Sequence, residues 1–138
     1  MSKPPTIHRR QFLLLALGLA GSVAAGSKLS GAAEGWLRHG NLSAKLTALF
    51  IHQESAQAIG RAYLQRFSQE ADVRTLEDRI AQGIAGGRTL LVATGKPEIS
   101  KLLTDRIRQD FATDQIVKVQ GWILSITEAR LCALAALA

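Results

Sequence analysis

The sequence predicts a mainly α-helical domain with a short β-strand or hairpin before its C-terminal helix. Apolar residues recur every three or four positions over most of residues 42–111, which is the period of an amphipathic helix. The period changes to two in "QIVKVQGWIL", residues 115–124. Ser125 and Glu128 then form a capping-box pattern that begins a last helix. The chain has 138 residues, enough for one such domain.

The first helical region covers residues 43–68, as one long helix or two consecutive helices. Its apolar stripe consists of Leu42, Leu46, Leu49, Phe50, Ala56, Ile59, Tyr63 and Phe67. Asn41 or Ser43 can cap its start. Gly60 interrupts the stripe, which indicates either a close approach by a second helix or a weak point.

Two more helices are predicted before the strand region. The first covers about residues 73–85, with Asp72 as its cap and Gly86-Gly87 at its end. "RTLLVAT", residues 88–94, suits either a short strand or a buried turn of helix. Pro97 then suits the first turn of a helix over about residues 98–111.

The C-terminal part combines a strand pattern with an unusually apolar helix. Gln120-Gly121 is either a two-residue hairpin turn or a glycine bulge in a single strand. The last helix, "TEARLCALAALA", is apolar on nearly every face. Such a helix either packs centrally among the others or docks on a partner.

Residues 1–33 have the layout of a signal peptide. A basic start is followed by an apolar run from Phe12 to Ala25 and then by small and polar residues. The run of about 14 residues is too short to cross a bilayer core, which needs about 20. Cleavage near Ala25 or Ala33 would leave a single helical domain over residues 34–138.

A more specific pattern lies within this leader. It consists of Arg9, Arg10, Phe12 and Leu13. These residues resemble the twin-arginine export signal, although His8 and Leu14 depart from its usual pattern. The resemblance implies that the twin-arginine translocase exports the folded protein to the periplasm, and that only the leader contacts the membrane. An uncleaved N-terminal helix that anchors the protein to the membrane is the alternative.

The charge distribution argues against a nucleic-acid-binding protein. The whole chain has a formal charge of +6, but residues from Glu34 onward carry 13 basic and 11 acidic side chains, a balance of +2. The excess therefore lies in the leader, whereas a nucleic-acid site needs a basic face on the domain.

Catalytic, cofactor and metal sites are not expected. Cys132 is the only cysteine and lies in an apolar helix, where burial raises a thiol's pKa. His39 and His52, the histidines outside the leader, lack the spacing of a helical metal pair. "GGRTLLVATGK" has Leu90 where a phosphate-binding loop needs glycine, and Lys96 is followed by proline.

An interface is the more plausible kind of functional site. The candidate interface residues are Tyr63, Trp122, Arg130, Leu131 and Leu134. Tryptophan is enriched at interfaces, although Trp122 can equally anchor the junction between strand and last helix. Arg130 can pair with Glu128 or face a carboxylate of a partner.

A small helical chain with this leader resembles, in layout, the small subunits of bacterial membrane-bound gluconate, fructose and sorbitol dehydrogenases. The specific match covers residues 9–13. The resemblance implies an exported, non-catalytic accessory subunit, without a cofactor of its own, that binds, stabilises or escorts a larger redox enzyme carrying a flavin. A free-standing periplasmic ligand-binding protein or enzyme is the alternative.

Overall fold

Six α-helices, a 3-10 turn and one antiparallel hairpin make up residues 42–138, the part of the chain that the structure, a computed structural model, describes. In chain order they are α3 (Leu42–Thr47), α4 (Gln53–Arg66), η1 (Ser68–Glu70), α5 (Val73–Gln82), α6 (Gly87–Ala93), α7 (Lys96–Ala112), β1 (Ile116–Val119), β2 (Trp122–Ser125) and α8 (Ile126–Leu137). The predicted mainly α fold, with a hairpin directly before the last helix, is confirmed.

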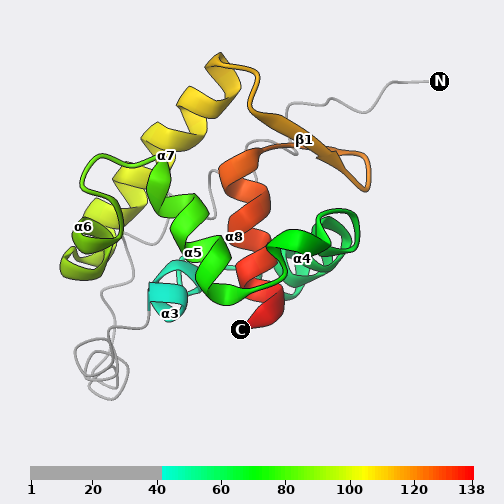
Figure 1. Cartoon of the computed structure of the whole chain (residues 1–138), viewed down its shortest axis with the longest axis horizontal. Helices are drawn as coiled ribbons and strands as arrows, with labels where there is room; N and C mark the ends of the chain where they lie inside the picture. The colour runs from blue at the N-terminus through cyan, green and yellow to red at the C-terminus, as the bar shows by residue number, and fades with distance from the viewer. Residues whose placement is uncertain (1–41) are drawn as a thin grey trace.

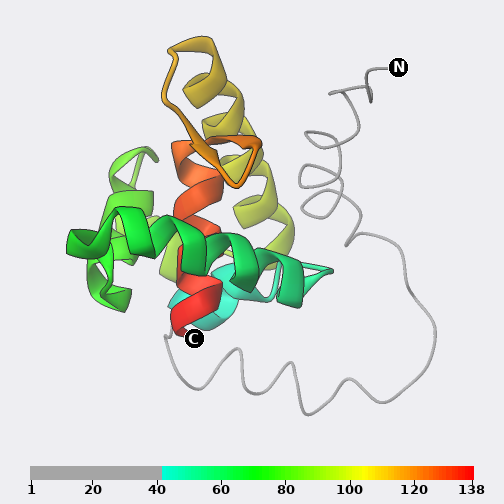
Figure 2. The same ribbon diagram turned by 90° about the vertical axis from the view of Figure 1, so that its right-hand side faces the viewer.

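Helix α8 is the central element. Helices α3, α4, α5 and α7 pack against it, and α6 packs against α5 at the periphery (Figures 1 and 2). Every residue from Thr127 to Ala135 is buried except Arg130, which is half-buried. The nearly uniform apolar character of this helix therefore follows from its central position. Of the two roles predicted for it, packing among the other helices is the one confirmed.

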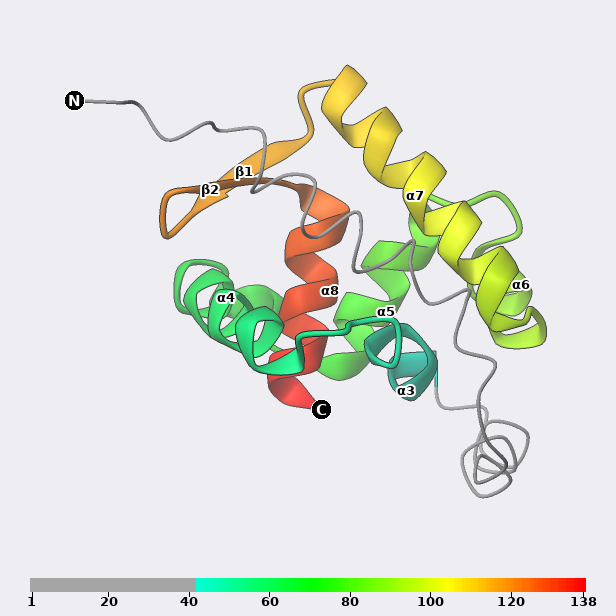
Figure 3. The ribbon, with the colours of Figure 1, turned by 180° about the vertical axis from the view of Figure 1, so that it is seen from behind.

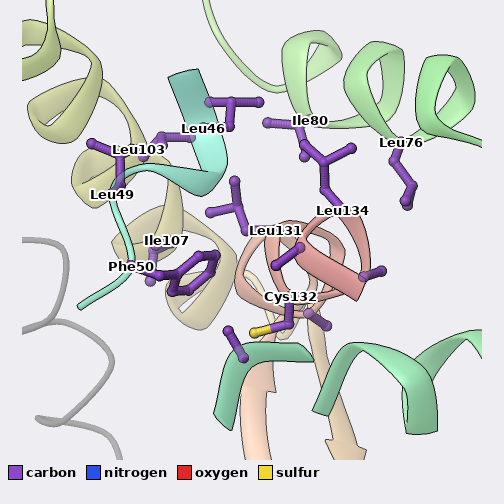
Figure 4. Close-up of a cluster of buried hydrophobic side chains, with 14 of the residues drawn as sticks. Leu46, Leu49, Phe50, Leu76, Ile80, Leu103, Ile107, Leu131, Cys132 and Leu134 are labelled. Carbon is purple, nitrogen blue, oxygen red and sulfur yellow. The ribbon is translucent and has the colours of Figure 1, made fainter. Parts of the chain in front are cut away.

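The buried apolar side chains lie around α8, which Figure 4 shows nearly end-on. Leu46 and Leu49 approach from the α3 side, Leu103 from α7, and Leu76 and Ile80 from α5. All five side chains are at most 1% exposed. One continuous apolar cluster thus joins segments from both ends of the described chain.

The first helical region forms two consecutive helices, one of the two predicted arrangements. Ser43 lies inside α3 and does not cap it, while Asn41 lies outside the described residues. On α4, Gly60 faces α8 so closely that a Cβ atom there would lie 2.0 Å from the carbonyl oxygen of Cys132. The glycine therefore marks a close helix crossing, as the sequence indicated.

The segment between α5 and α7 differs in part from the prediction. Asp72 caps α5 by accepting a hydrogen bond from the Thr75 N–H, as expected. The helix nevertheless ends at Gln82, and Gly86 adopts a φ of 87° at the start of α6. The prediction that Gly86-Gly87 ends the earlier helix is thus wrong, because these glycines make the turn into the next one. Residues 88–94 are mostly helical, not a strand.

Helix α7 begins two residues before the predicted start, with Pro97 in its first turn. The hairpin that follows pairs Val119 with Trp122 across a two-residue turn (Figure 3). Gln120 and Gly121 have φ values of 47° and 80°, as a type I′ turn requires. Of the two predicted arrangements, the hairpin is therefore confirmed, and the single strand with a glycine bulge is not found. Its inner face, made by Val117, Val119 and Leu124, is buried.

No helix within residues 42–138 has the length and apolar character needed to cross a membrane.

Candidate functional site

The predicted interface residues do not form one accessible surface. Tyr63, Leu131 and Leu134 are at most 1% exposed and belong to the core, so a partner cannot reach them in this structure. Trp122 and Arg130 are half-buried and retain some exposed surface. The residues of the predicted export signal, Arg9, Arg10, Phe12 and Leu13, lie outside the described part of the chain.

A buried polar cluster, consisting of Tyr63, Glu70 and Arg130, lies where α4, η1 and α8 meet. The Arg130 guanidinium holds the Glu70 carboxylate with two hydrogen bonds, Nη2 to Oε1 at 2.8 Å and Nε to Oε2 at 3.0 Å. The Tyr63 hydroxyl donates a third, to Oε2 at 2.8 Å. Both oxygens of Glu70 are therefore occupied, and the cluster ties three segments together.

The contacts of this cluster perturb the pKa values of its members. The hydrogen bond from Arg130 holds the pKa of the Glu70 carboxyl below its usual value, against an opposing effect of burial. Burial, reinforced by the neighbouring Glu70 carboxylate, raises the pKa of the Tyr63 hydroxyl. Glu70 is thus held as an anion and Tyr63 as a neutral donor, which are the states that the hydrogen bonds require.

The low pKa of Glu70 predicts a loss of stability in acid. A carboxyl group whose pKa is lower in the folded than in the unfolded protein stabilises the fold at neutral pH. That contribution is lost as protons bind, progressively below about pH 5. Urea unfolding between pH 7 and pH 3 is expected to show a falling free energy of unfolding.

The Glu70→Gln variant is the control for this pH dependence. It is expected to be less stable than the natural chain at pH 7, because the amide carries no charge to pair with Arg130. Its stability should also change less between pH 7 and pH 3. If acid destabilises both proteins equally, the pH dependence does not come from Glu70.

A second group of polar contacts fixes the start of α8. The Ser125 hydroxyl accepts from the Glu128 N–H, and the Glu128 carboxylate accepts from the Ser125 N–H, which confirms the predicted capping box. Asp110 of α7 is fully buried and accepts from the Thr127 N–H at 3.0 Å. Its other oxygen lies 2.9 Å from Arg106 Nη2, close enough for an ion pair but not aligned for a hydrogen bond. The two carboxylates complement the positive end of the helix dipole.

Cys132 is fully buried in α8, as its apolar surroundings predicted. Burial raises the pKa of the thiol to about 12, and the nearby Glu128 carboxylate adds to the effect. The thiol is therefore protonated at neutral pH and is a poor nucleophile. Its side chain is part of the apolar core cluster.

Metal binding has no obvious place in the described part of the chain. His52 is exposed, and His39 lies outside the described residues. Between Leu42 and Ala138, no three His, Cys, Asp or Glu residues are grouped so that they could hold a metal ion.

Sequence reasoning missed three of the four buried carboxylates, Glu70, Glu77 and Asp110. Glu70 lies 60 residues from Arg130, and Asp110 lies 17 residues from Thr127. Helical spacing connects residues three or four positions apart, so it carries no signal for such pairs. For Arg130, the sequence offered Glu128 or a carboxylate of a partner, and the structure instead pairs it with Glu70.

Comparison of the chain with known proteins finds no matching family model, curated protein or solved structure.

Proposed function

We propose that this chain is an exported, non-catalytic small subunit that binds, stabilises or escorts a larger periplasmic or membrane-bound oxidoreductase. The leader motif at residues 9–13 supports export in the folded state. A folded export route suits a protein that travels with a partner whose cofactor is inserted in the cytoplasm. The proposal makes the described domain a rigid binding module.

The observation that carries this proposal is that the buried carboxylates are bound within the domain. Glu70 and Glu77 are held by Arg130 and Arg88, and Asp110 and Glu128 bond to backbone N–H groups at the start of α8. These groups stabilise the packing of the helices, and each of them has at least one carboxylate oxygen bound by a partner within the domain. A general base instead needs an oxygen within reach of a substrate proton. Buried contacts of this kind hold the helices in fixed positions, and they thereby fix the surface residues that would bind a partner.

The predicted interface is revised by the burial of Tyr63, Leu131 and Leu134. Trp122 and Arg130 remain as candidates, because each is only half-buried. Trp122 is the first residue of β2, and Arg130 lies in the second turn of α8, the helix that directly follows β2. We therefore place the contact with the larger subunit on this side of the domain, with Trp122 as its aromatic anchor.

Replacing Arg9 and Arg10 by lysine is expected to leave the chain in the cytoplasm together with its partner. Lysine keeps the positive charge, so the change affects only recognition of the arginine pair by the translocase. The chain, tagged after Ala138 and produced in its native cells, is followed by immunoblotting of cytoplasmic and periplasmic fractions. The partner is followed by dye-linked dehydrogenase activity and by release of flavin from the purified complex.

Arg38→Lys, the same substitution after the predicted cleavage sites, is the matched control and should leave export unchanged. Two results would contradict the proposal. One is normal export of the Lys-Lys variant. The other is a periplasmic chain that purifies alone while the dehydrogenase activity of the cells is exported without it.

A further inference from the structure

The outer face of the hairpin combines apolar and basic side chains. Residues alternate between the two faces of a strand, and the register pairs Lys118 with Ile123 and Ile116 with Ser125. Ile116 and Ile123 are therefore diagonal neighbours on the face turned away from the core, with Lys118 between them. Their exposed fractions, 45% and 56%, are among the largest of the large hydrophobic side chains between Leu42 and Ala138.

A second cation lies at the edge of β1, next to this face. Arg66, at the end of α4, donates a hydrogen bond from Nη1 to the Lys118 carbonyl oxygen at 3.2 Å. Its guanidinium also lies 5.3 Å from the centre of the Phe67 ring, which limits its movement. Within residues 42–138 no carboxylate forms an ion pair with Arg66 or Lys118, and Lys118 is the one charged residue of the two strands.

The small size of this face, made by Ile116, Lys118 and Ile123, favours a lipid surface over a protein partner. A stable protein interface buries about 800 Å² on each partner, far more than two half-exposed isoleucines can supply. A lipid surface needs less, because a few aliphatic side chains enter the boundary of the acyl chains while cations bind headgroup phosphates. The charge of the patch complements anionic lipid.

We propose that the outer face of the hairpin binds an anionic membrane surface. Ile116 and Ile123 enter the boundary between headgroups and acyl chains, and Lys118 and Arg66 bind the phosphates. The sequence predicted membrane contact through the leader alone, and the proposal adds a second contact through the folded domain. It does not depend on the proposed oxidoreductase partner, since the hairpin is complete in the single chain.

The test places a polarity-sensitive fluorophore on the hairpin of the full chain. Ile123→Cys provides the attachment point, because Cys132 is fully buried and does not compete for the label. The matched control is Ile51→Cys. Ile51 lies between α3 and α4 and is 53% exposed, much like Ile123. A local probe separates insertion of the hairpin from binding by the leader.

Vesicles containing phosphatidylglycerol are expected to shift the emission of the probe at position 123 to the blue, whereas the probe at position 51 stays in water. Phosphatidylcholine vesicles should cause little shift. Lys118→Gln and Arg66→Gln should each raise the lipid concentration for half-maximal change about fivefold. The Ile116→Ser substitution, made with the probe at position 123, should weaken binding as well.

Three results would overturn the proposal. In the first, the probe at position 123 stays in water, or both probes shift alike. In the second, phosphatidylcholine acts as well as phosphatidylglycerol. In the third, the shift occurs without vesicles and grows with protein concentration, which would mean that a second copy of the chain covers this face.

Discussion

The Gly60→Ala variant is expected to lose more than about 4 kcal/mol of unfolding free energy, which is enough to unfold most small domains. The added Cβ atom would lie 2.0 Å from the Cys132 carbonyl oxygen and 2.8 Å from the Ala133 nitrogen. Cβ atoms essentially never come within 3.0 Å of other atoms. Since both neighbours belong to the backbone of the central helix, neither can rotate away, and α4 must separate from α8.

Circular dichroism during heating and urea titration measures this loss. Gly95→Ala is the matched control, because its Cβ atom would meet the far end of the flexible Glu98 side chain at 3.2 Å and Pro97 Cδ at an ordinary contact distance of 3.9 Å. That control should unfold at nearly the same urea concentration as the natural chain. If Gly60→Ala also unfolds there, the backbones of α4 and α8 are further apart than the structure has them.

The glycine illustrates what the sequence could predict about the fold. Its place within an apolar stripe indicated either a close helix approach or a weak point, and the approach is the one found. The capping box at Ser125 was also predicted, and the hairpin at Gln120-Gly121 was one of two predicted arrangements. Both could be read from the sequence because caps and turns depend on residues within a few positions of one another. Local chemistry thus accounts for most of the elements.

Two features could not be predicted in the same way. Gly86-Gly87 suits the end of one helix as well as the turn into the next, and the boundary was placed wrongly for that reason. The second feature is the accessibility of the candidate site. Tyr63 and Leu131 were candidates for an interface because an apolar stripe has the same pattern whether it faces a core or a partner. Only the arrangement of the helices around α8 decides between the two.

Replacing Arg130 by methionine is expected to cost about 3 kcal/mol of unfolding free energy. Methionine replaces the aliphatic part of the arginine side chain but removes both hydrogen bonds to Glu70. The Glu70 carboxylate, whose side chain is 9% exposed, would then be a buried charge with the Tyr63 hydroxyl as its remaining partner in the cluster. We place the loss at the low end of values for broken buried pairs, because the Arg130 side chain keeps 18% of its surface in water.

A second substitution separates the lost attraction from the cost of the unpaired charge. Adding Glu70→Gln to Arg130→Met should recover part of the stability, because a neutral amide costs less to bury than a lone carboxylate. The double-mutant cycle, measured by urea unfolding at pH 7, then yields the coupling energy of the two residues. A coupling near zero would show that the bidentate contact does not form in solution.

Lys101→Met is the control for removing a cation from an ion pair at the surface. Lys101 pairs with Asp105 one turn along α7, and these side chains are 77% and 52% exposed. Water screens such a pair, so the unfolding free energy should hardly change. The same variants test the proposed function. Arg130 is itself a candidate for the contact with the larger subunit, and its guanidinium is held in place by Glu70 of η1. Arg130→Met should therefore weaken recovery of that subunit from the periplasm, while Lys101→Met leaves the recovery unchanged.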